Sequence, residues 1–381
     1  MLNRREFSML SVLFGSGLIP ISSFSNSAKP FLILIELSGA NDGLNTVIPY
    51  SNDRYYGLRP NIAIHEKELL KLDDNQALHP SLGTMMNLYN RGNLKILQNV
   101  GYPNQIQSHF RSMEVWERGG DGRLNRQNGW LVDDIQTQLN NIYDANGIYL
   151  GGTRDIFAGG NAWFLGPDFH HSIRARKKIK QIDESNSRLN LLQQLTNKRK
   201  INSEILDLIS KKFVNAQKMS VRGGKVGKQL KTVCNLLSAE IIFPVFKVKH
   251  GSFDTHIRQK SVHQKLLRDL DLAITDLVYN IKRIGLWDEC LIMTYSEFGR
   301  RVRENGAQGT DHGTAAPHFL IGGHVTSGVF GGIPDLEHLT NNDLRFSIDF
   351  RAVYEAVLRN HFKLDKNSFS EFKRPELLFS A

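Results

Sequence analysis

Short, nearly continuous hydrophobic runs alternate along the chain with longer amphipathic segments. The clearest run is Phe31-Leu-Ile-Leu-Ile-Glu-Leu37, which is rich in branched residues and is followed at once by Ser38-Gly39. A run of this length and composition is typical of a strand buried on both faces of a parallel sheet. The same reasoning predicts strands at residues 94–100, 241–248, 291–295 and 318–321.

Helical patterns lie between these strands. Hydrophobic residues recur at three- and four-residue spacing over residues 82–91, 227–238, about 258–284 and 350–362. The alternation of strands and helices predicts a doubly wound α/β sheet. In such a sheet, functional side chains gather on the loops that leave the carboxyl ends of the strands. We therefore expect the chemistry of this chain to lie in the segments that follow the predicted strands.

Length and composition agree with a large globular α/β domain. The chain has 381 residues, of which 40% are hydrophobic and 23% charged, so a mainly disordered or fibrous protein is excluded. Its two cysteines, Cys234 and Cys290, are too few for a disulfide-rich scaffold, and the sequence leaves open whether they pair or stay as buried thiols. No hydrophobic run reaches the roughly 18–20 residues of a membrane-spanning helix, so we expect a protein that is not integral to a membrane.

The first 28 residues have the layout of a secretory signal. Arg4-Arg-Glu-Phe7 precedes a short apolar segment, and Ser25-Asn-Ser-Ala28 offers small residues that a signal peptidase could cut. Adjacent arginines indicate export through the twin-arginine translocase, which carries folded proteins. We therefore expect residues 1–28 to be a twin-arginine signal peptide. Residues 29–381 are expected to form a single domain located in the periplasm or outside the cell.

Most of the formal net charge of +10 comes from one stretch. Residues 174–212 contain eleven lysines and arginines against four acidic residues. Leucines and isoleucines recur there at helical spacing, so we expect a basic helical insertion at about 170–222. Such a stretch could bind a polyanion or a membrane surface, but we favour the solvated face of inserted helices. No nucleic-acid-binding module accompanies it, and no nucleic-acid partner is expected.

Polar side chains follow the first two predicted strands. Asn41 and Asp42 come after the first strand, where Asn-Asp-Gly by itself would be an ordinary turn. Ser108 comes after the second, at the expected start of a helix. It either caps free backbone N–H groups or presents a nucleophilic hydroxyl beside them. His109 and Arg111 add a candidate proton carrier and a candidate anion clamp.

The later loops carry residue types that bind metal ions. In chain order these are Asp254 and His256 after the third strand, Glu297 after the fourth, and Asp311 with His312 just before the fifth. Carboxylate and imidazole are ordinary ligands of zinc-type sites. We therefore expect a clustered polar site. His263, on the helix after the third strand, is a weaker candidate because a helix histidine usually packs in the core.

The loop sequences together resemble a known family. They are Asn41-Asp-Gly-Leu-Asn45, Ser108-His-Phe-Arg-Ser112, Phe253-Asp-Thr-His256, Ser296-Glu-Phe-Gly-Arg300 and Gly309-Thr-Asp-His-Gly-Thr-Ala-Ala-Pro317. Over nearly the whole mature chain they resemble the exported bacterial family catalogued as domain of unknown function 1501. That family is similar to the alkaline phosphatase and sulfatase superfamily. The resemblance implies an alkaline phosphatase-like α/β fold, an αβα sandwich around one mostly parallel central sheet, with a divalent metal such as zinc, calcium, manganese or magnesium.

The resemblance also implies roles for single residues. It places the nucleophile at Ser108. It places metal ligands at Asp42 with Asn41, at Asp254 and His256, at Glu297, and at His312 with Asp311. Two departures matter. Alkaline phosphatases have an Asp-His pair where this chain has Ser296-Glu297, which leaves the number of metals open, and the proline that a formylglycine sulfatase needs is absent after Ser108.

Two functions of different class remain. The first is an exported metal-dependent hydrolase of phosphate or related esters, with Ser108 as nucleophile and a small anionic ester as substrate. The second is a non-catalytic binding or assembly protein of the cell envelope on a degenerate form of the same fold, with an envelope polymer as partner. The mature sequence holds no Gly-x-Ser-x-Gly, His-Glu-x-x-His or P-loop motif. The metal hypothesis requires the tips of the predicted ligands to lie within roughly 4–8 Å of one another.

Overall fold

The computed structural model describes residues 29–123, 126–139, 143, 147–159, 211–212, 217–372 and 379. The predicted signal peptide and most of the predicted basic insertion lie outside these residues. Within them, no helix is long and apolar enough to cross a membrane.

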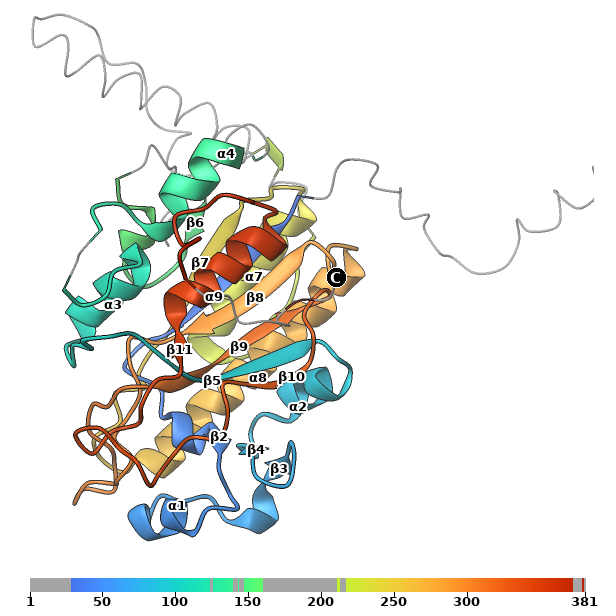
Figure 1. Cartoon of the computed structure of the whole chain (residues 1–381). Coiled ribbons are helices and arrows are strands. Elements are labelled where there is room, and N and C mark those ends of the chain that lie inside the picture. The colour runs from blue at the N-terminus through green and yellow to red at the C-terminus, as the bar shows by residue number, and fades with distance from the viewer. Residues whose placement is uncertain are drawn as a thin grey trace, which may run out of the picture.

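The described chain is built on one central sheet of eight strands (Figure 1). The strands are β1 (Phe31–Leu37), β5 (Leu94–Gly101), β6 (Ile148–Tyr149), β7 (Val245–His250), β8 (Cys290–Tyr295), β9 (Ala316–Gly322), β10 (Gly328–Phe330) and β11 (Ile348–Asp349). Their order is β10-β5-β9-β8-β1-β7-β6, and β11 pairs with the end of β5. β1 therefore lies inside the sheet with parallel partners on both sides, as its continuous hydrophobic run predicts.

One strand runs against the others. β9 pairs antiparallel with both β5 and β8, whereas the other pairs of the central sheet are parallel. The sheet is thus mixed but mostly parallel, and the predicted α/β class is confirmed. Because β9 is reversed, the residues just before it lie at the edge where the parallel strands end. The loop that carries His312 consequently reaches the same edge as the loops after β1, β7 and β8.

Helices cover both faces of the sheet. In β1, odd-numbered residues such as Phe31 and Ile33 pack in a core with the helices α2, α7 and α8, and even-numbered residues such as Leu32 and Leu34 pack in a second core with α3 and α9. Figure 1 shows α9 and α8 on opposite sides of the sheet. Alternate side chains of one strand thus supply two cores, which is the αβα arrangement.

The longer helices agree closely with the predicted ones. They are α2 (Gly83–Asn90), α3 (His109–Arg118), α7 (Gly224–Ser238), α8 (Gln259–Arg283) and α9 (Phe350–Ala356), which continues as a π-helical turn at Val357–His361. Short elements were not predicted: α1 (Asp53–Leu58), α4 (Thr137–Leu139), and a small antiparallel sheet of β2 (Val47–Ile48), β4 (Ala77–Leu78) and β3 (Leu70–Lys71). Cys234 and Cys290, whose pairing was open, are both buried free thiols.

A buried ion-pair network attaches α3 to the sheet. Lys247 of β7 lies between Glu117 of α3 and Glu36 of β1, and the three side chains are at most 2% exposed. The Lys247 ammonium also donates to the backbone oxygen of Thr153 at 2.6 Å, and the Tyr295 hydroxyl donates to Glu117 at 3.0 Å. Buried charges persist only when they are paired and hydrogen-bonded. The network therefore fixes the position of α3, whose first turn begins at the candidate site.

Candidate metal centre

The predicted polar site lies at the edge of the sheet where β1, β7 and β8 end and β9 begins. His109 is the first residue of α3, Asp254 and His256 lie in the loop after β7, and His312 lies in the loop before β9. Their backbone is fixed locally by close packing. Gly39, two residues after the end of β1, has φ +106°, and a Cβ at this position would lie 2.5 Å from the backbone nitrogen of Asp254. Only glycine fits there without strain.

Three imidazoles surround one carboxylate oxygen. The Nε2 atoms of His256, His312 and His109 lie 3.0, 3.3 and 3.4 Å from Oδ1 of Asp254. Nε2 of His256 also lies 3.2 Å from Nε2 of His312. One ligand atom each from His109, Asp254 and His312 lies within 4.8 Å of the others. The chain thus gathers three nitrogen donors and one oxygen donor from three segments: the start of α3, the loop after β7 and the loop before β9.

The far side of each ring is held by an oxygen acceptor. Nδ1 of His109 binds Oε1 of Glu297 at 2.6 Å, Nδ1 of His256 binds Oδ1 of Asp311 at 3.2 Å, and Nδ1 of His312 binds the backbone oxygen of Gln107 at 3.0 Å. Carboxylates and carbonyls accept hydrogen bonds, so each Nδ1 carries the proton. In its neutral form every ring therefore points an Nε2 lone pair at Asp254, which is the arrangement of metal-bound histidines.

The donor set fits a divalent metal. Nε2 of His109 is buried and makes no hydrogen bond with the described residues, although it lies near Asp254. The lone pairs of His256 and His312 would repel each other at 3.2 Å unless a proton or a cation lies between them. Three imidazoles and a carboxylate suit zinc and related divalent transition metals.

Glu297 contacts the His109 ring on the side that faces away from Asp254. Its side chain is 1% exposed, and its Oε1 also accepts from the backbone N–H of Gly39 at 2.8 Å. The hydrogen bond from His109 to Glu297 raises the pKa of His109, an effect that burial partly opposes. Glu297 therefore orients an imidazole instead of facing Asp254 itself.

The guanidinium group of Arg300 also contacts Asp254. Its Nη2 lies 2.5 Å from Oδ1 of Asp254 and 3.1 Å from the backbone oxygen of Phe253, while Nε donates to Ala40 at 2.8 Å. Burial alone would raise the pKa of Asp254, but the hydrogen bond and charge of Arg300, together with the neighbouring imidazoles, lower it to about 2. Arg300 thus keeps Asp254 ionised and joins the loops after β1 and β7.

Asp42 and Asn41 have other partners. Oδ2 of Asp42 accepts from Nη1 of Arg59 at 2.6 Å and from Gln259, and the Asp42 side chain is 1% exposed. Asn41 binds Nε2 of His263 at 2.9 Å. Burial would raise the pKa of Asp42, but the charge and hydrogen bond of Arg59 hold it below its ordinary value. The structure therefore does not bring these two predicted ligands into the histidine group, nor His263.

Ser108 and Arg111 lie on the exposed first turn of α3. Ser108 is the N-cap residue, but its hydroxyl makes no hydrogen bond to the free N–H groups of the helix. Arg111 is half exposed and pairs with Glu114 at 2.6 Å. The geometry therefore shows no helix-capping bond from the Ser108 side chain. The Arg111 side chain runs along the helix toward Glu114.

Some site residues were assigned a different role or missed. His109 was predicted as a proton carrier but lies among the metal-binding candidates. Glu297 and Asp311 were predicted as metal ligands, and each binds the Nδ1 atom of an imidazole instead. Arg300 was missed, although it stands in the same Ser-Glu-Phe-Gly-Arg segment as Glu297. Its position just after a predicted strand could have indicated that Arg300 belongs to the site.

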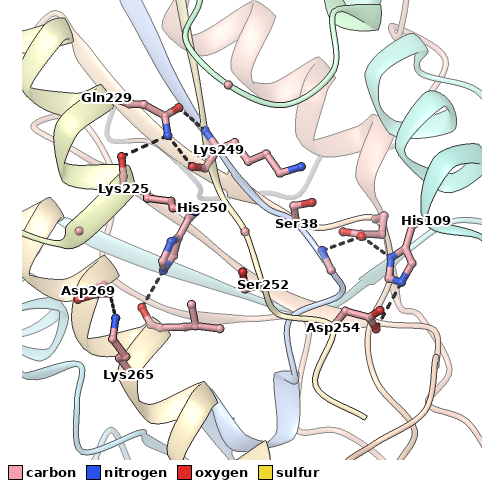
Figure 2. A pocket seen from close by; sticks show the side chains of 16 residues that line it. Ser38, His109, Lys225, Gln229, Lys249, His250, Ser252, Asp254, Lys265 and Asp269 are labelled. Carbon is pink, nitrogen blue, oxygen red and sulfur yellow. Dashed lines mark hydrogen bonds and ion pairs between the residues drawn. The ribbon is translucent and has the colours of Figure 1, made fainter. Parts of the chain in front are cut away.

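A cavity of about 770 Å³ opens beside this centre (Figure 2). His109 and Asp254 line one side of it, and Lys225 and Gln229 of α7 line the other. Lys249 and Lys265 also line the cavity; Lys265 pairs with Asp269 at 2.8 Å. The cavity therefore offers ammonium groups to an anion, and His109 is the imidazole of the centre that lines it.

Comparison with known families identifies the chain. The model of a family described as protein of unknown function (DUF1501) matches residues 29–343. The chain belongs to the DUF1501 family. The resemblance noted in the sequence is thereby confirmed. A comparison with curated protein sequences finds no match.

Three solved structures illustrate the likeness in fold. A protein in the alkaline phosphatase superfamily from Vibrio parahaemolyticus is 10% identical, with a TM-score of 0.40, over 81% of this chain and 64% of its own. The lipoteichoic acid synthase LtaP from Listeria monocytogenes is 11% identical, with a TM-score of 0.40, over 80% of this chain and 68% of its own. Ps i-CgsB in complex with k-i-k-neocarrahexaose is 12% identical, with a TM-score of 0.44, over 92% of this chain and 75% of its own. Likeness at this level transfers no residue role to the DUF1501 chain.

Proposed function

We propose that this DUF1501 protein is an exported, metal-dependent hydrolase of phosphate or related esters. The observation that carries the proposal is the convergence of three imidazole Nε2 atoms on Oδ1 of Asp254, at 3.0–3.4 Å. His109, Asp254, His256 and His312 would hold the metal. When bound, a divalent metal would supply positive charge that stabilises phosphoryl oxygens and lowers the pKa of a nearby hydroxyl.

The chain's own groups would bind and orient the ester. Lys225, Lys249 and Lys265 line the cavity and attract an anionic substrate. The free N–H groups at the start of α3 can donate to an oxyanion, since a helix amino terminus carries partial positive charge. Glu297 holds the His109 ring in one orientation, so that this donor does not have to reorganise during the reaction.

Ser108 is the proposed nucleophile. Its oxygen would form a bond to phosphorus while the bond from phosphorus to the leaving oxygen breaks. The Ser108 proton would pass to solvent, to which the residue is exposed, and the leaving group would take a proton from solvent. Water would then cleave the seryl ester and release phosphate with free Ser108. Because the Ser108 hydroxyl makes no helix-capping bond, it is available for this step.

Metal binding and turnover test the proposal separately. Elemental analysis and titration calorimetry with zinc and manganese should show binding that His312→Ala and Asp254→Asn abolish. His338→Ala is the matched control, because His338 is an exposed histidine paired with Asp335. With aryl phosphate mono- and diesters, Ser108→Ala should lower turnover by about a thousandfold or more. Equal rates for Ser108→Ala and the unmodified protein would contradict the assignment of the nucleophile.

One observation favours the second function, a non-catalytic binding or assembly protein of the cell envelope. The Arg300 guanidinium lies 2.5 Å from Asp254 and balances its charge without any metal. A protein that needs only this ion pair would bind no divalent metal and would hydrolyse none of the esters tested. Absence of metal from protein purified from its native host, with unchanged stability after chelation, would support it.

Export is proposed from the first 28 residues. Arg4 and Arg5 would direct the precursor to the twin-arginine translocase. Replacing both by lysine should leave the precursor in the cytoplasm. Appearance of the processed protein in the envelope of a strain without that translocase would contradict the proposed route.

A further inference from the structure

A second cavity, of about 630 Å³, lies next to the metal centre. Its wall is formed by residues from the loop after β5, from the segment before β11 and from the loop between β8 and β9: Tyr102, Asn104, Gln105, Gln107, Thr340, Asn341, Asp343, Leu344, Arg345, Phe346, Arg301 and Thr314. Gln107 belongs to its wall, and the backbone oxygen of Gln107 binds His312. The two cavities therefore flank the same short segment, which leads into Ser108.

The second cavity contains buried polar atoms without partners in the described part of the chain. The Asp343 side chain is 2% exposed; its Oδ2 lies 3.2 Å from Nε2 of Gln107 and 3.5 Å from Nη1 of Arg301. Its Oδ1 has no hydrogen-bond partner among the described residues. Both the oxygen and the nitrogen of the Gln105 amide are likewise buried and find no partner there. Native proteins pair nearly all such atoms, so this concentration points to a ligand.

The chemistry of the wall selects the class of ligand. A phosphate or sulfate would bring negative charge against Asp343, and a metal ion would bring positive charge against Arg301. Gln105 needs both a donor and an acceptor, and Asp343 needs a donor. A hydroxyl group supplies both roles without net charge.

The cavity also offers an apolar surface. Phe346 lines it and is 37% exposed, so part of its ring is open to a ligand. A sugar ring presents hydroxyl groups at its edge and C–H groups on its face. An aromatic side chain beside convergent polar groups can contact both at once.

We propose that this cavity binds an uncharged, polyhydroxylated ring of the sugar class. The Asp343 carboxylate and the Gln105 amide take the ring hydroxyls, and Phe346 contacts its C–H face. The binding does not depend on the proposed hydrolase activity, because neither Asp343 nor Phe346 contacts the histidine group.

Saturation-transfer NMR and titration calorimetry on the full chain test this proposal. The probes are N-acetylglucosamine, chitobiose, cellobiose and maltose, with inorganic phosphate as the anionic comparison. We expect at least one saccharide to bind in the millimolar range, unchanged by chelation of metals. Phe346→Ala and Asp343→Asn should each weaken binding by about tenfold or more, and His338→Ala should not.

The controls separate a folding defect from a lost site. Phe346 is partly exposed, so Phe346→Ala should melt at nearly the temperature of the unmodified protein. The proposal is overturned if no saccharide in the set binds, or if binding persists unchanged in both variants. It is also overturned if phosphate binds and Asp343→Asn strengthens that binding, because the cavity would then be an anion site.

Discussion

Replacing Lys247 by methionine removes the central cation of the buried network that holds α3. The Lys247 side chain is 0% exposed and lies between two carboxylates, those of Glu117 and Glu36, which are 0% and 2% exposed. Methionine keeps much of the apolar volume and removes the charge. Two buried carboxylates would then lie close together, with the partly exposed Lys249, 3.7 Å from Glu36, as the nearby counter-charge. Glu36 has a raised pKa even in the native protein, because burial outweighs the attraction of Lys247.

The expected loss in free energy of unfolding is about 3–5 kcal/mol at neutral pH, the usual cost of breaking a buried ion pair from one side. The pH dependence has a definite sign. Burial already raises the pKa of Glu36 above its ordinary value, and loss of Lys247 removes an attraction that lowers it, so ionisation of Glu36 then opposes folding more strongly. The difference between Lys247→Met and the unmodified protein should therefore be largest at neutral pH and should shrink as the pH falls toward about 4.

Urea denaturation followed by circular dichroism measures this effect. Lys249→Met is the matched control, because Lys249 lies two residues further along β7, is 41% exposed and is 3.7 Å from Glu36. Because Lys249 is partly exposed and lies at the longer distance, its pairing with Glu36 should contribute about 1 kcal/mol or less. The double variant Lys247→Met with Glu117→Gln should recover part of the loss. Equal effects of Lys247→Met and Lys249→Met would refute the role of the buried network in holding α3.

Three further changes test the site and the core. Glu297→Gln should weaken metal binding about 10- to 100-fold in titration calorimetry, because Glu297 fixes the proton on Nδ1 of His109; unchanged affinity would contradict this orientation role. Gly39→Ala should lower the free energy of unfolding by about 1–3 kcal/mol, since the residue has φ +106° and its Cβ would contact the backbone of Asp254; a neutral effect in urea denaturation would show that the loop can move. Burial lowers the pKa of His318 to about 3, so the unfolded chain binds a proton at His318 more readily than the folded chain does. The free energy of unfolding should therefore fall as the pH drops from about 6.5 toward 3. His318→Leu should flatten that part of the stability profile, and an unchanged slope would exclude His318 as its source.

The fold was predictable where hydrophobic burial determines the backbone. Residues 31–37 were expected as a strand, and β1 has these bounds because alternate side chains supply two separate cores. The two- and three-residue strands were not predictable, because so few residues cannot display an alternation of hydrophobic and polar positions. The direction of β9 was not predictable either. A strand buried on both faces has the same hydrophobic run in either direction.

The loops of the site were predictable, but the partners of each side chain were not. The strand-end rule indicated Asp254, His256 and His312, which the structure brings together. The same rule indicated Asp42, yet Arg59 binds that carboxylate from a segment that follows no predicted strand. Strand order fixes which loops meet; it does not fix which nearby cation a buried carboxylate binds.

The charges of the site lead to a final prediction about metal stoichiometry. At their ordinary charges, Asp254, Glu297 and Asp311 carry three negative charges, and Arg300 returns one positive charge to Asp254. The imidazoles of a metal centre are neutral, so two negative charges remain, which one divalent ion offsets. A second ion beside Arg300 would leave uncompensated positive charge, and Asp42, a predicted further ligand, is bound to Arg59. Elemental analysis should therefore find one metal per chain. That ion should bind the unmodified protein, in which Arg59 still pairs with Asp42. Two metals per chain at saturation would show that Asp42 exchanges Arg59 for a metal ion. The prediction that one divalent ion balances the charge of the site would then be wrong.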